Sequence, residues 1–582
     1  MTKVKIDKIL LSIFQRAFKS ITDEMSISLT KTTRSPILCE AKDFVTGIYD
    51  EKGNMLEQTE NLPILSFSLG PVCKVIIDQY GDNIYPGDVI MHNDVFSMGN
   101  QNNDVAIFKP IFTGETLIGW SAAKGHQADI GGAVQGGYNP NATEVWQEAL
   151  RIPAVKLYEK GELRQDVWNL IFANIRLSMV QEDIKAQIGA CSLGARRLSN
   201  LVEKYGIDSY NAHKEELFNS TERMMREEIR LIPNGVYEGS SNVYYDGKHL
   251  DSKFEIRANI TVEDEDITFD FTPSSSQTNG FVNGTYTSTC SAITLTLLQM
   301  VNPNIPHNEG MVKPLKYIVP EGSILNASYP KATTFGNHLC PQIADSIFKA
   351  LGPAIPSKVT AGWNHLLCSL FTGNHDKTGE KYVDICFMGL KGGSGALEGN
   401  DGYDHIGMID ASGGLLDQDY EMYEQQTPHL ILKHEYLKDS GGVGKWRGGL
   451  GVHTIIQMGG DNTTMVVFGD GDVERNYGLF GGKGSVLNHI KLKYPDGKEK
   501  VPLNKDMIEG IPDGTIYDQV AGGGGGFGSP NERDLNSLQQ DIDNEVVTKN
   551  QAIDQYNVIF KNNSSEIDFD KTRELRINSV DN

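Results

Sequence analysis

The chain has 582 residues, and its 76 Asp and Glu residues against 53 Lys and Arg residues give a formal net charge of −23 at pH 7. An acidic balance of this size argues against binding to nucleic acid through the phosphate backbone. The length exceeds what one hydrophobic core normally organises, and the 39% of hydrophobic residues suffices for well-packed domains, so we expect two to four of them.

The cysteines and the apolar segments indicate in which cellular compartment we expect the protein. The cysteines are odd in number and contain no Cys-x-x-Cys pair, which argues against a closed disulfide framework. The apolar patch at residues 9–14 is interrupted by Gln15 and Arg16, so it is too short to span a membrane. We therefore expect a cytoplasmic protein without a membrane segment. The seven cysteines are Cys39, Cys73, Cys191, Cys290, Cys340, Cys368 and Cys386.

Two elements are predicted near the N-terminus. Apolar residues recur at helical spacing between residues 5 and 30, and Pro36 marks the change to extended structure. Residues 45–49 and 55–58 then predict a hairpin. Asp43 therefore stands at the entrance of a strand.

Residues 99–132 contain the main candidate site. Residues 105–112 and 117–123 predict two strands joined by a turn within Thr-Gly-Glu-Thr. A three-residue loop places Asp104 opposite His126, whereas a two-residue loop places it opposite Gly125 and needs a bulge to approach the histidine. Both registers make Asp104 and His126 near neighbours.

An aspartate beside a histidine has two interpretations. The pair suits a divalent cation such as Zn²⁺ or Mn²⁺, or it is a structural hydrogen bond that ties off the hairpin. Asp43 is a candidate third metal ligand. His92 could reach the same site from a neighbouring loop or be a structural histidine, and Asp94 is a candidate to orient a metal-bound imidazole.

The middle of the chain is predicted to be mostly helical up to Pro233-Asn234-Gly235. Residues 235–271 then alternate apolar and polar side chains in short runs, which predicts an antiparallel meander. Residues 331–338 and 401–405 combine flexible backbone with polar groups and are candidate substrate-facing loops. The predicted helices of this region span residues 144–150, 166–188, 213–229, 288–300 and 342–351.

The last 150 or so residues are rich in glycine and in short apolar runs, which is typical of a β-rich domain. The predicted strands span residues 430–436, 452–458, 464–468 and 490–494. The whole pattern predicts a multi-domain α+β fold of mixed helices and antiparallel sheets with a β-rich, glycine-rich C-terminal part. We place the domains at residues 1–234, 235–425 and 426–582.

Three glycine-rich stretches, residues 441–451, 481–485 and 522–528, lack the spacing of a P-loop. Lys445 and Arg447 could bring cationic side chains and exposed amides to an anionic cofactor, or belong to a structural loop or subunit contact. The run at 522–528 is better explained as a close crossing of backbones, because residues without Cβ permit such an approach.

Two motifs resemble the hydantoinase B family, which includes hydantoinase B subunits, the second half of 5-oxoprolinases and subunits of acetone and acetophenone carboxylases. They are Asn-Asp-Val-Phe-Ser-Met-Gly-Asn-Gln-Asn-Asn-Asp at residues 93–104 and His-Gln-Ala-Asp-Ile-Gly-Gly at residues 126–132. The spacing of the family is kept, but Gln101 replaces its first histidine. Residues 174–176, 183–187, 439–451, 522–528 and 530–534 extend the resemblance over essentially the whole chain.

The resemblance implies a B-type subunit that works with an A-type, ATPase-like partner in a hetero-oligomer. The partner would use ATP to phosphorylate a small-molecule carbonyl substrate, and this chain would complete the hydrolysis of a cyclic amide such as a hydantoin, a lactam or oxoproline. Asp43, Asp104 and His126 would hold a divalent metal whose bound water attacks. Gln101 could add a carbonyl oxygen, and Asp129 would orient His126 or accept a proton.

Two alternatives remain open from the sequence. The chain could be a subunit of an ATP-dependent ketone carboxylase, in which the metal positions bicarbonate or carbon dioxide. It could also be a non-catalytic structural subunit that lost its metal, for which the glutamine at position 101 is the motivating observation.

Overall fold

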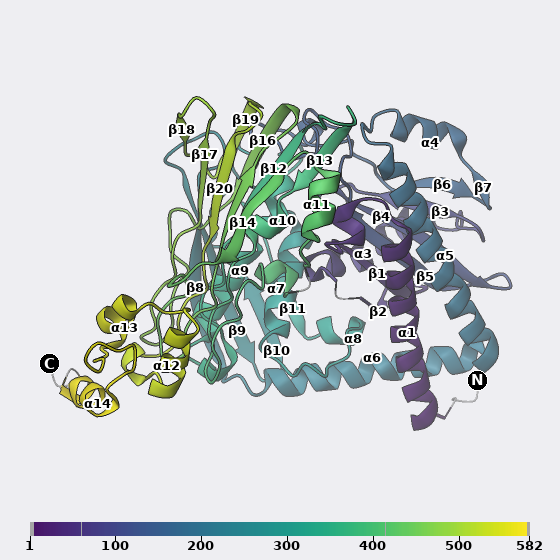
Figure 1. Ribbon diagram of the computed structural model, residues 1–582. Helices are drawn as coiled ribbons and strands as arrows, with labels where there is room; N and C mark the ends of the chain where they lie inside the picture. Colours follow the sequence, from purple (N-terminus) through teal and green to yellow (C-terminus); the bar gives the residue numbers. More distant parts are fainter. Residues whose placement is uncertain (1–4, 60, 414, 579–582) are drawn as a thin grey trace. The chain divides into compact units, whose positions relative to one another are not determined.

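The computed structural model describes residues 5–59, 61–413 and 415–578, and it divides the chain into two compact units (Figure 1). The first unit comprises Met1–Ala350 with Gly414–Gln418, and the second comprises Leu351–Gly413 with Asp419–Asn582. Whether the three predicted domains, residues 1–234, 235–425 and 426–582, fold independently stays a prediction. Among the described residues, no helix combines the length and the apolar character needed to cross a membrane.

The first unit is built on a seven-stranded antiparallel sheet that carries the predicted hairpin near its middle. In spatial order its strands are β2 (Met55–Gln58), β1 (Phe44–Asp50), β5 (Thr116–His126), β4 (Asp104–Thr113), β3 (Val89–His92), β6 (Val155–Glu159) and β7 (Glu162–Leu163). The strands predicted at residues 45–49 and 55–58, and those at residues 105–112 and 117–123, are therefore confirmed.

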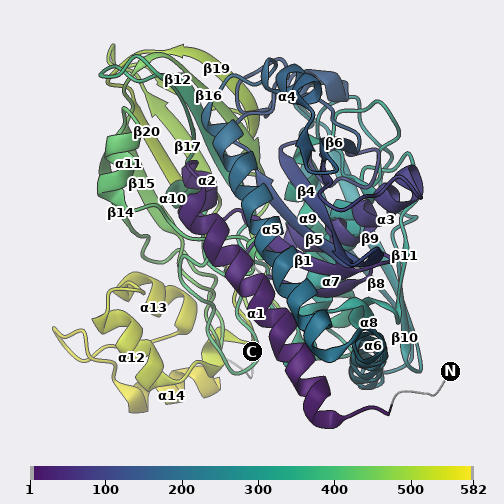
Figure 2. The same cartoon turned by 90° about the vertical axis from the view of Figure 1, so that its right-hand side faces the viewer.

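Two long helices run side by side along this sheet, α1 (Lys8–Thr32) and α5 (Met179–Tyr205) (Figure 2). The side chain of Asp7 accepts hydrogen bonds from the first free amides of α1, and the predicted apolar spacing buries one face of the helix. Gly194 of α5 permits the close approach, because a Cβ there would overlap Met25 and Ser121.

The remaining elements of the first unit are a second, four-stranded sheet and further helices and turns. Here β10 and β11 are parallel and the other pairs are antiparallel, which confirms the predicted meander. The strands, in spatial order, are β11 (Leu315–Ile318), β10 (Asp266–Asp270), β9 (Lys253–Glu263) and β8 (Gly235–Tyr244). The helices and 3₁₀ turns are α2 (Pro36–Cys39), η1 (Pro63–Ser68), α3 (Leu69–Tyr80), η2 (Val145–Gln147), α4 (Gln165–Phe172), α6 (Ile207–Ile229), α7 (Tyr286–Leu298), α8 (Glu309–Val312), η3 (Thr334–Leu339) and α9 (Cys340–Leu351).

Two of the predicted helices are wrong. Residues 144–150 form only the short turn η2, because the amide of Leu150 donates to Ile130 and the carboxylate of Glu148 accepts the amides of Thr333 and Thr334. The helix predicted over 166–188 is two helices, α4 and α5. It is interrupted where the amide of Arg176 donates to the Asp129 side chain at 2.8 Å instead of to a helical carbonyl.

The second unit contains two antiparallel sheets and confirms the predicted β-rich C-terminal part. The order of one sheet is β13 (Lys381–Ile385), β12 (Leu367–Asn374), β16 (Asp461–Gly469) and β19 (Lys505–Ile511). The other is β14 (Leu430–Tyr436), β15 (Val452–Gln457), β20 (Ile516–Ala521), β17 (His489–Lys493) and β18 (Glu499–Lys500). One buried cluster draws residues from both sheets, including Phe371, Met465, Ile456 and Tyr517. The helices are α10 (Phe387–Leu390), α11 (Tyr420–Gln426), α12 (Leu535–Asp543), α13 (Lys549–Tyr556) and α14 (Phe569–Asn578).

The glycine run at residues 522–528 is a close backbone crossing, as predicted. Gly524 donates its amide to Gly449 at 3.0 Å and accepts the amide of Gly442 at 2.8 Å. A Cβ on Gly524 would overlap the carbonyl of Ser394, and one on Gly525 would overlap the carbonyl of Tyr477. These glycines are needed for space and not for an unusual backbone angle.

The buried carboxyl of Asp384 makes the stability of the second unit depend on pH. It accepts a hydrogen bond from the Tyr423 hydroxyl at 2.8 Å, and burial raises its pKa to about 7 although that bond opposes the rise. Between the ordinary aspartate pKa and about pH 7 the unfolded chain loses this proton while the folded chain keeps it. Stability therefore falls as pH rises through this window, by up to about 4 kcal/mol.

We expect Asp384→Asn to flatten this decline, because asparagine keeps an acceptor for Tyr423 and has no proton to lose. The measurement is the urea midpoint between pH 4 and 8, with the exposed Asp376→Asn as the matched control. An equal decline in the wild type and in Asp384→Asn would contradict the assignment.

Candidate functional site

The hairpin of β4 and β5 combines the two registers considered from the sequence. Thr113 pairs with Thr116, which leaves a two-residue turn, and a bulge follows because Phe112 pairs with Leu117 but Ile111 pairs with Gly119. The extra residue in β5 restores the match, so Asp104 lies directly opposite His126. The predicted proximity of these two side chains is confirmed.

His126 stands between two carboxylates on the neighbouring strands. Its Nδ1 lies 3.0 Å from Asp104 Oδ1 and 4.0 Å from Asp43 Oδ2. Burial lowers the pKa of His126, but the hydrogen bond to Asp104 and the charges of Asp43 and Asp104 outweigh it, so the net shift is upward. Two anionic groups thus favour a positive charge at this imidazole, whether a proton or a cation supplies it.

Asp104 is held by two asparagine side chains. Asn100 donates to Asp104 Oδ2 at 2.6 Å, and Asn337 of η3 donates to the same oxygen at 2.9 Å. The carboxylate is therefore fixed before any ligand binds, with Oδ1 turned toward His126.

Gln101 is engaged with its neighbours through both ends of its side-chain amide. Its amide donates to the Tyr138 hydroxyl at 2.9 Å, and its carbonyl accepts from Asn337 at 3.0 Å. The Tyr138 hydroxyl also lies 3.0 Å from Nε2 of His338, whose pKa burial lowers to about 3. Gln101 thus links the hairpin to η3.

Lys124 adds a buried amine to the same face of the sheet, since it lies two residues before His126 in β5. Its ammonium contacts the Ser68 hydroxyl and donates to Asn100 Oδ1 at 2.8 Å. Burial lowers the pKa of Lys124 to about 7, although Asp104 opposes the shift. Asn100 therefore connects the lysine to the Asp104 carboxylate.

The donor set fits a divalent cation in part. Asp43, just before β1, Asp104 of β4 and His126 of β5 offer two carboxylates and an imidazole nitrogen, a mixture that Zn²⁺ and Mn²⁺ accept. The carbonyl oxygen of Gln101 accepts one hydrogen bond from Asn337 and has its second lone pair left for a cation. Gln101 as a fourth ligand therefore stays a prediction.

Among the interactions of the described residues, no hydrogen bond or ion pair joins Asp129 to His126. Asp129 is fully buried, and its carboxylate binds the guanidinium of Arg176 at 2.9 Å and the Arg176 amide at 2.8 Å. These contacts tie the segment between α4 and α5 to the loop that follows β5. A direct part in proton transfer at His126 finds no support in this geometry.

We expect Asp129→Ala to destabilise the protein by about 1–3 kcal/mol, because it leaves the partly buried amide of Arg176 without its acceptor and removes one of the two acceptors of the Arg176 guanidinium. The urea midpoint measures this effect. Arg164→Ala, which breaks an exposed ion pair with Asp166, is the control and should leave the urea midpoint nearly unchanged. Equal, small effects of both substitutions would contradict the assignment.

The hydrogen bonds and ion pairs described for His92 and Asp94 involve neither Asp104 nor His126. His92 ends β3 and is buried, so it does not belong to a loop as predicted. Burial lowers its pKa to about 4, and its Nε2 has no hydrogen-bond partner among the described residues. Asp94 forms a bidentate ion pair with Arg151, with N···O distances of 2.6 and 2.9 Å, and does not orient His126.

Lys445 and Arg447 belong to the second unit, and both are paired with carboxylates. Arg447 lies 3.0 Å from Asp404 and 3.3 Å from Asp541, whereas Lys445 lies 3.2 Å from Glu532. The predicted anion site would have to compete with these pairs, so the contacts favour the structural-loop alternative.

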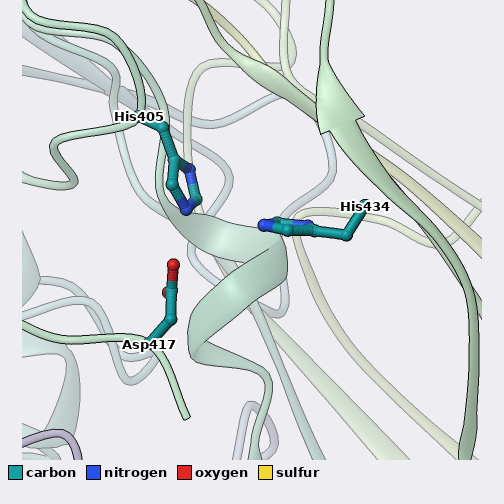
Figure 3. Close-up of side chains that lie close together, drawn as sticks. All are labelled: His405, Asp417 and His434. Carbon is teal, nitrogen blue, oxygen red and sulfur yellow. The ribbon is translucent and has the colours of Figure 1, made fainter. Parts of the chain in front are cut away.

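The second unit also places two histidines side by side. The ring centres of His405 and His434 lie 5.1 Å apart (Figure 3). Nδ1 of His405 lies 2.9 Å from the carbonyl of Lys391, and Nδ1 of His434 lies 2.8 Å from the Thr454 hydroxyl. Asp417, also drawn in Figure 3, belongs to the first unit. Sequence reasoning singled out residues 401–405 but not His434.

Comparisons with known proteins cover nearly the whole chain. A sequence model described as hydantoinase B/oxoprolinase matches residues 7–530. The caprolactamase subunit beta of Pseudomonas jessenii is 33% identical over 96% of this chain and 97% of its own length. Among solved structures, the ATP-dependent caprolactamase from Pseudomonas jessenii matches with a TM-score of 0.91 and 30% identity over 99% of this chain and 100% of that chain. An acetone carboxylase structure shares the fold, with a TM-score of 0.90 at 20% identity over 99% of this chain and 83% of that chain.

Proposed function

The chain belongs to the hydantoinase B/oxoprolinase family, and on that basis we propose that it is the B-type subunit of an ATP-dependent enzyme that hydrolyses a cyclic amide. The observation that carries the proposal is the buried pair of Asp104 and His126, at 3.0 Å, with a second carboxylate on the adjacent strand. The 33% identity to a caprolactamase subunit supports an amide as the substrate class.

The reaction has two halves. In the A-type partner, the carbonyl oxygen of the amide takes the terminal phosphoryl group of ATP, which leaves ADP and makes the carbonyl carbon electrophilic. Water then attacks that carbon, the ring C–N bond breaks with protonation of nitrogen, and a second water releases phosphate. The products are the ring-opened amino acid, ADP and phosphate, and two waters are consumed.

This chain would serve the second half. Asp104, fixed by Asn100 and Asn337, holds the imidazole of His126 so that His126 can take a proton from the attacking water. If a divalent cation is bound, Asp43, Asp104 and His126 would hold it, and it would supply an acidified water. Lys124 lies one position further along the same face and limits the net negative charge of the cluster.

The test is turnover by this chain purified in complex with its A-type partner. Hydantoins, lactams and ketones are supplied with ATP, with and without bicarbonate, and both ADP and the organic product are measured. Ring opening of an amide without bicarbonate is the expected result. Consumption of a ketone that requires bicarbonate would overturn the assignment and favour the carboxylase alternative.

A further inference from the structure

The carboxylate of Glu148 holds two consecutive backbone amides at the start of η3. Glu148 is fully buried and directly follows η2, and its two oxygens accept the amides of Thr333 and Thr334 at 2.8 and 2.9 Å. The first amides of a helical turn have no acceptor within the turn itself. A side chain from 185 positions earlier in the sequence therefore fixes the beginning of η3.

An ion pair does not account for this carboxylate. Among the residues that the structure describes, no cationic side chain pairs with Glu148, and its hydrogen bonds are those to the two amides. Burial raises the pKa of Glu148 to about 7, although the amide hydrogen bonds oppose the rise. A buried carboxylate without a cation is costly. A glutamine would accept one amide and present its own N–H groups to the other, so only the carboxylate serves both.

η3 carries the side chain that ties the candidate site together. The side-chain amide of Asn337 donates to Asp104 Oδ2 at 2.9 Å and to the Gln101 carbonyl at 3.0 Å. Its oxygen accepts from Asn100 at 3.2 Å. These three partners lie within five residues of one another at the start of β4, so the position of η3 determines how Asp104 is presented to His126.

The backbone on both sides of Glu148 is fixed to the loop that follows β5. The amide of Leu150 donates to the carbonyl of Ile130 at 2.8 Å, and the amide of Ala133 donates to the carbonyl of Gln147 at 3.0 Å. This loop begins next to the imidazole of the candidate pair. The carboxylate thus connects the loop after one member of the pair to the turn that holds the other member.

We propose that Glu148 is a positioning residue for the Asp104–His126 pair and acts on it through η3 and Asn337. The inference rests on the proposed function and deepens it by adding to the same site a residue outside the predicted set. If the start of η3 moves, Asp104 loses one of the two donors that fix Oδ2. Small displacements of catalytic groups lower reaction rates strongly.

The first experiment compares Glu148→Gln with the wild type, each as the full-length chain in complex with its A-type partner. The kcat of ATP-dependent ring opening should fall about tenfold or more, which corresponds to about 1.4 kcal/mol. The KM for ATP should stay unchanged, because the partner uses the ATP. Thermal unfolding and retention of the partner show whether the variant is folded.

A double-mutant cycle with Asn337→Ala tests the path of the effect. Asn337→Ala alone should lower kcat about tenfold or more, and adding Glu148→Gln should lower it by less than a further twofold. A loss of the same factor in both backgrounds would overturn the inference, because general loosening of the fold does not depend on Asn337. If the Glu148→Gln complex does not assemble, full turnover by a folded Asn337→Ala complex still overturns it.

Asp88→Asn is the matched control for the cycle. Asp88 is also fully buried and precedes β3, and its two oxygens accept the amides of Tyr85 and Lys160 at 2.9 and 2.8 Å. It also pairs with Lys156. Because it is bonded to other loops, Asp88→Asn should change kcat by the same factor in both backgrounds. The same additive behaviour in Glu148→Gln would contradict the proposed path.

The outcomes separate this inference from the proposed function. If the complex opens cyclic amides and the two substitutions act additively on kcat, Glu148 is not a positioning residue and the proposed function stands. If the complex instead carboxylates a ketone, and the kcat of that reaction shows the non-additive pattern, the proposed function is wrong and the role of Glu148 stands.

Discussion

Replacement of His126 by alanine lowers the rate of ATP-dependent ring opening by the complex about 10²-fold or more, if this imidazole acts in proton transfer as proposed. The side chain is buried and lies 3.0 Å from the Asp104 carboxylate, so bulk water does not readily take over its role. Asp104→Asn should produce a comparable loss, because it keeps the shape of the side chain but removes the charge that favours the protonated imidazole. Product formation under saturating ATP is the measurement.

The control for His126→Ala is His249→Ala. The His249 side chain is 63% exposed and pairs with Asp246, so its loss should leave turnover unchanged. Circular dichroism and retention of the A-type partner show whether each variant is folded. Full activity of a folded His126→Ala complex would contradict the assignment and favour the alternative of a non-catalytic structural subunit. Metal analysis of the same samples tests whether the substitution also removes a bound cation.

A single added methyl group at Gly524 should prevent stable folding of the second unit. The new Cβ would overlap the carbonyl of Ser394, and the backbone of Gly524 is hydrogen bonded to Gly442 and Gly449 on either side, so the chain has no direction in which to move. Overpacking of flexible side chains typically costs about 1–3 kcal/mol, and a clash with backbone should cost more. We expect Gly524→Ala to reduce soluble yield or to lower the urea midpoint severely.

Gly189→Ala is the matched control, because a Cβ at that position of α5 meets nothing within 4 Å. Alanine is also the better helix former by about 1 kcal/mol, so this variant should be as stable as the wild type or slightly more stable. A Gly524→Ala protein with a wild-type urea midpoint would show that the crossing can relax.

The sequence predicts elements well where one periodic pattern is uninterrupted. The amphipathic helix α1 and the meander of β8 to β10 follow from the local spacing of apolar residues. The close backbone crossing at the glycine run follows from the space that residues without Cβ leave. The failures occur where distant partners take the hydrogen bonds of the backbone. Glu148 and Asp129 each accept amides from far along the chain, and the helices predicted beside them are shortened or interrupted.

The candidate site divides in the same way. The proximity of Asp104 and His126 is a local property of one hairpin, so spacing alone predicts it. Lys124 carried a signal that was missed, since it lies two residues before His126 in a strand and must share its face. Asn337 lies in the predicted loop 331–338, but no sequence signal identified its role. It bonds Asp104 across 233 positions of sequence, and local spacing does not predict such a contact.

The bulge in β5 has a consequence for which lengths of this hairpin are compatible with function. Removing the extra residue, Ile118, would abolish the bulge and leave Asp104 opposite His126, whereas adding one residue between the bulge and His126 would bring Gly125 opposite Asp104 and turn the imidazole to the face of the sheet that α5 covers. The bulge thus gives this hairpin an asymmetric tolerance to changes in length: it can lose one residue and keep the Asp104–His126 pair, but it cannot gain one in the strand without a second bulge.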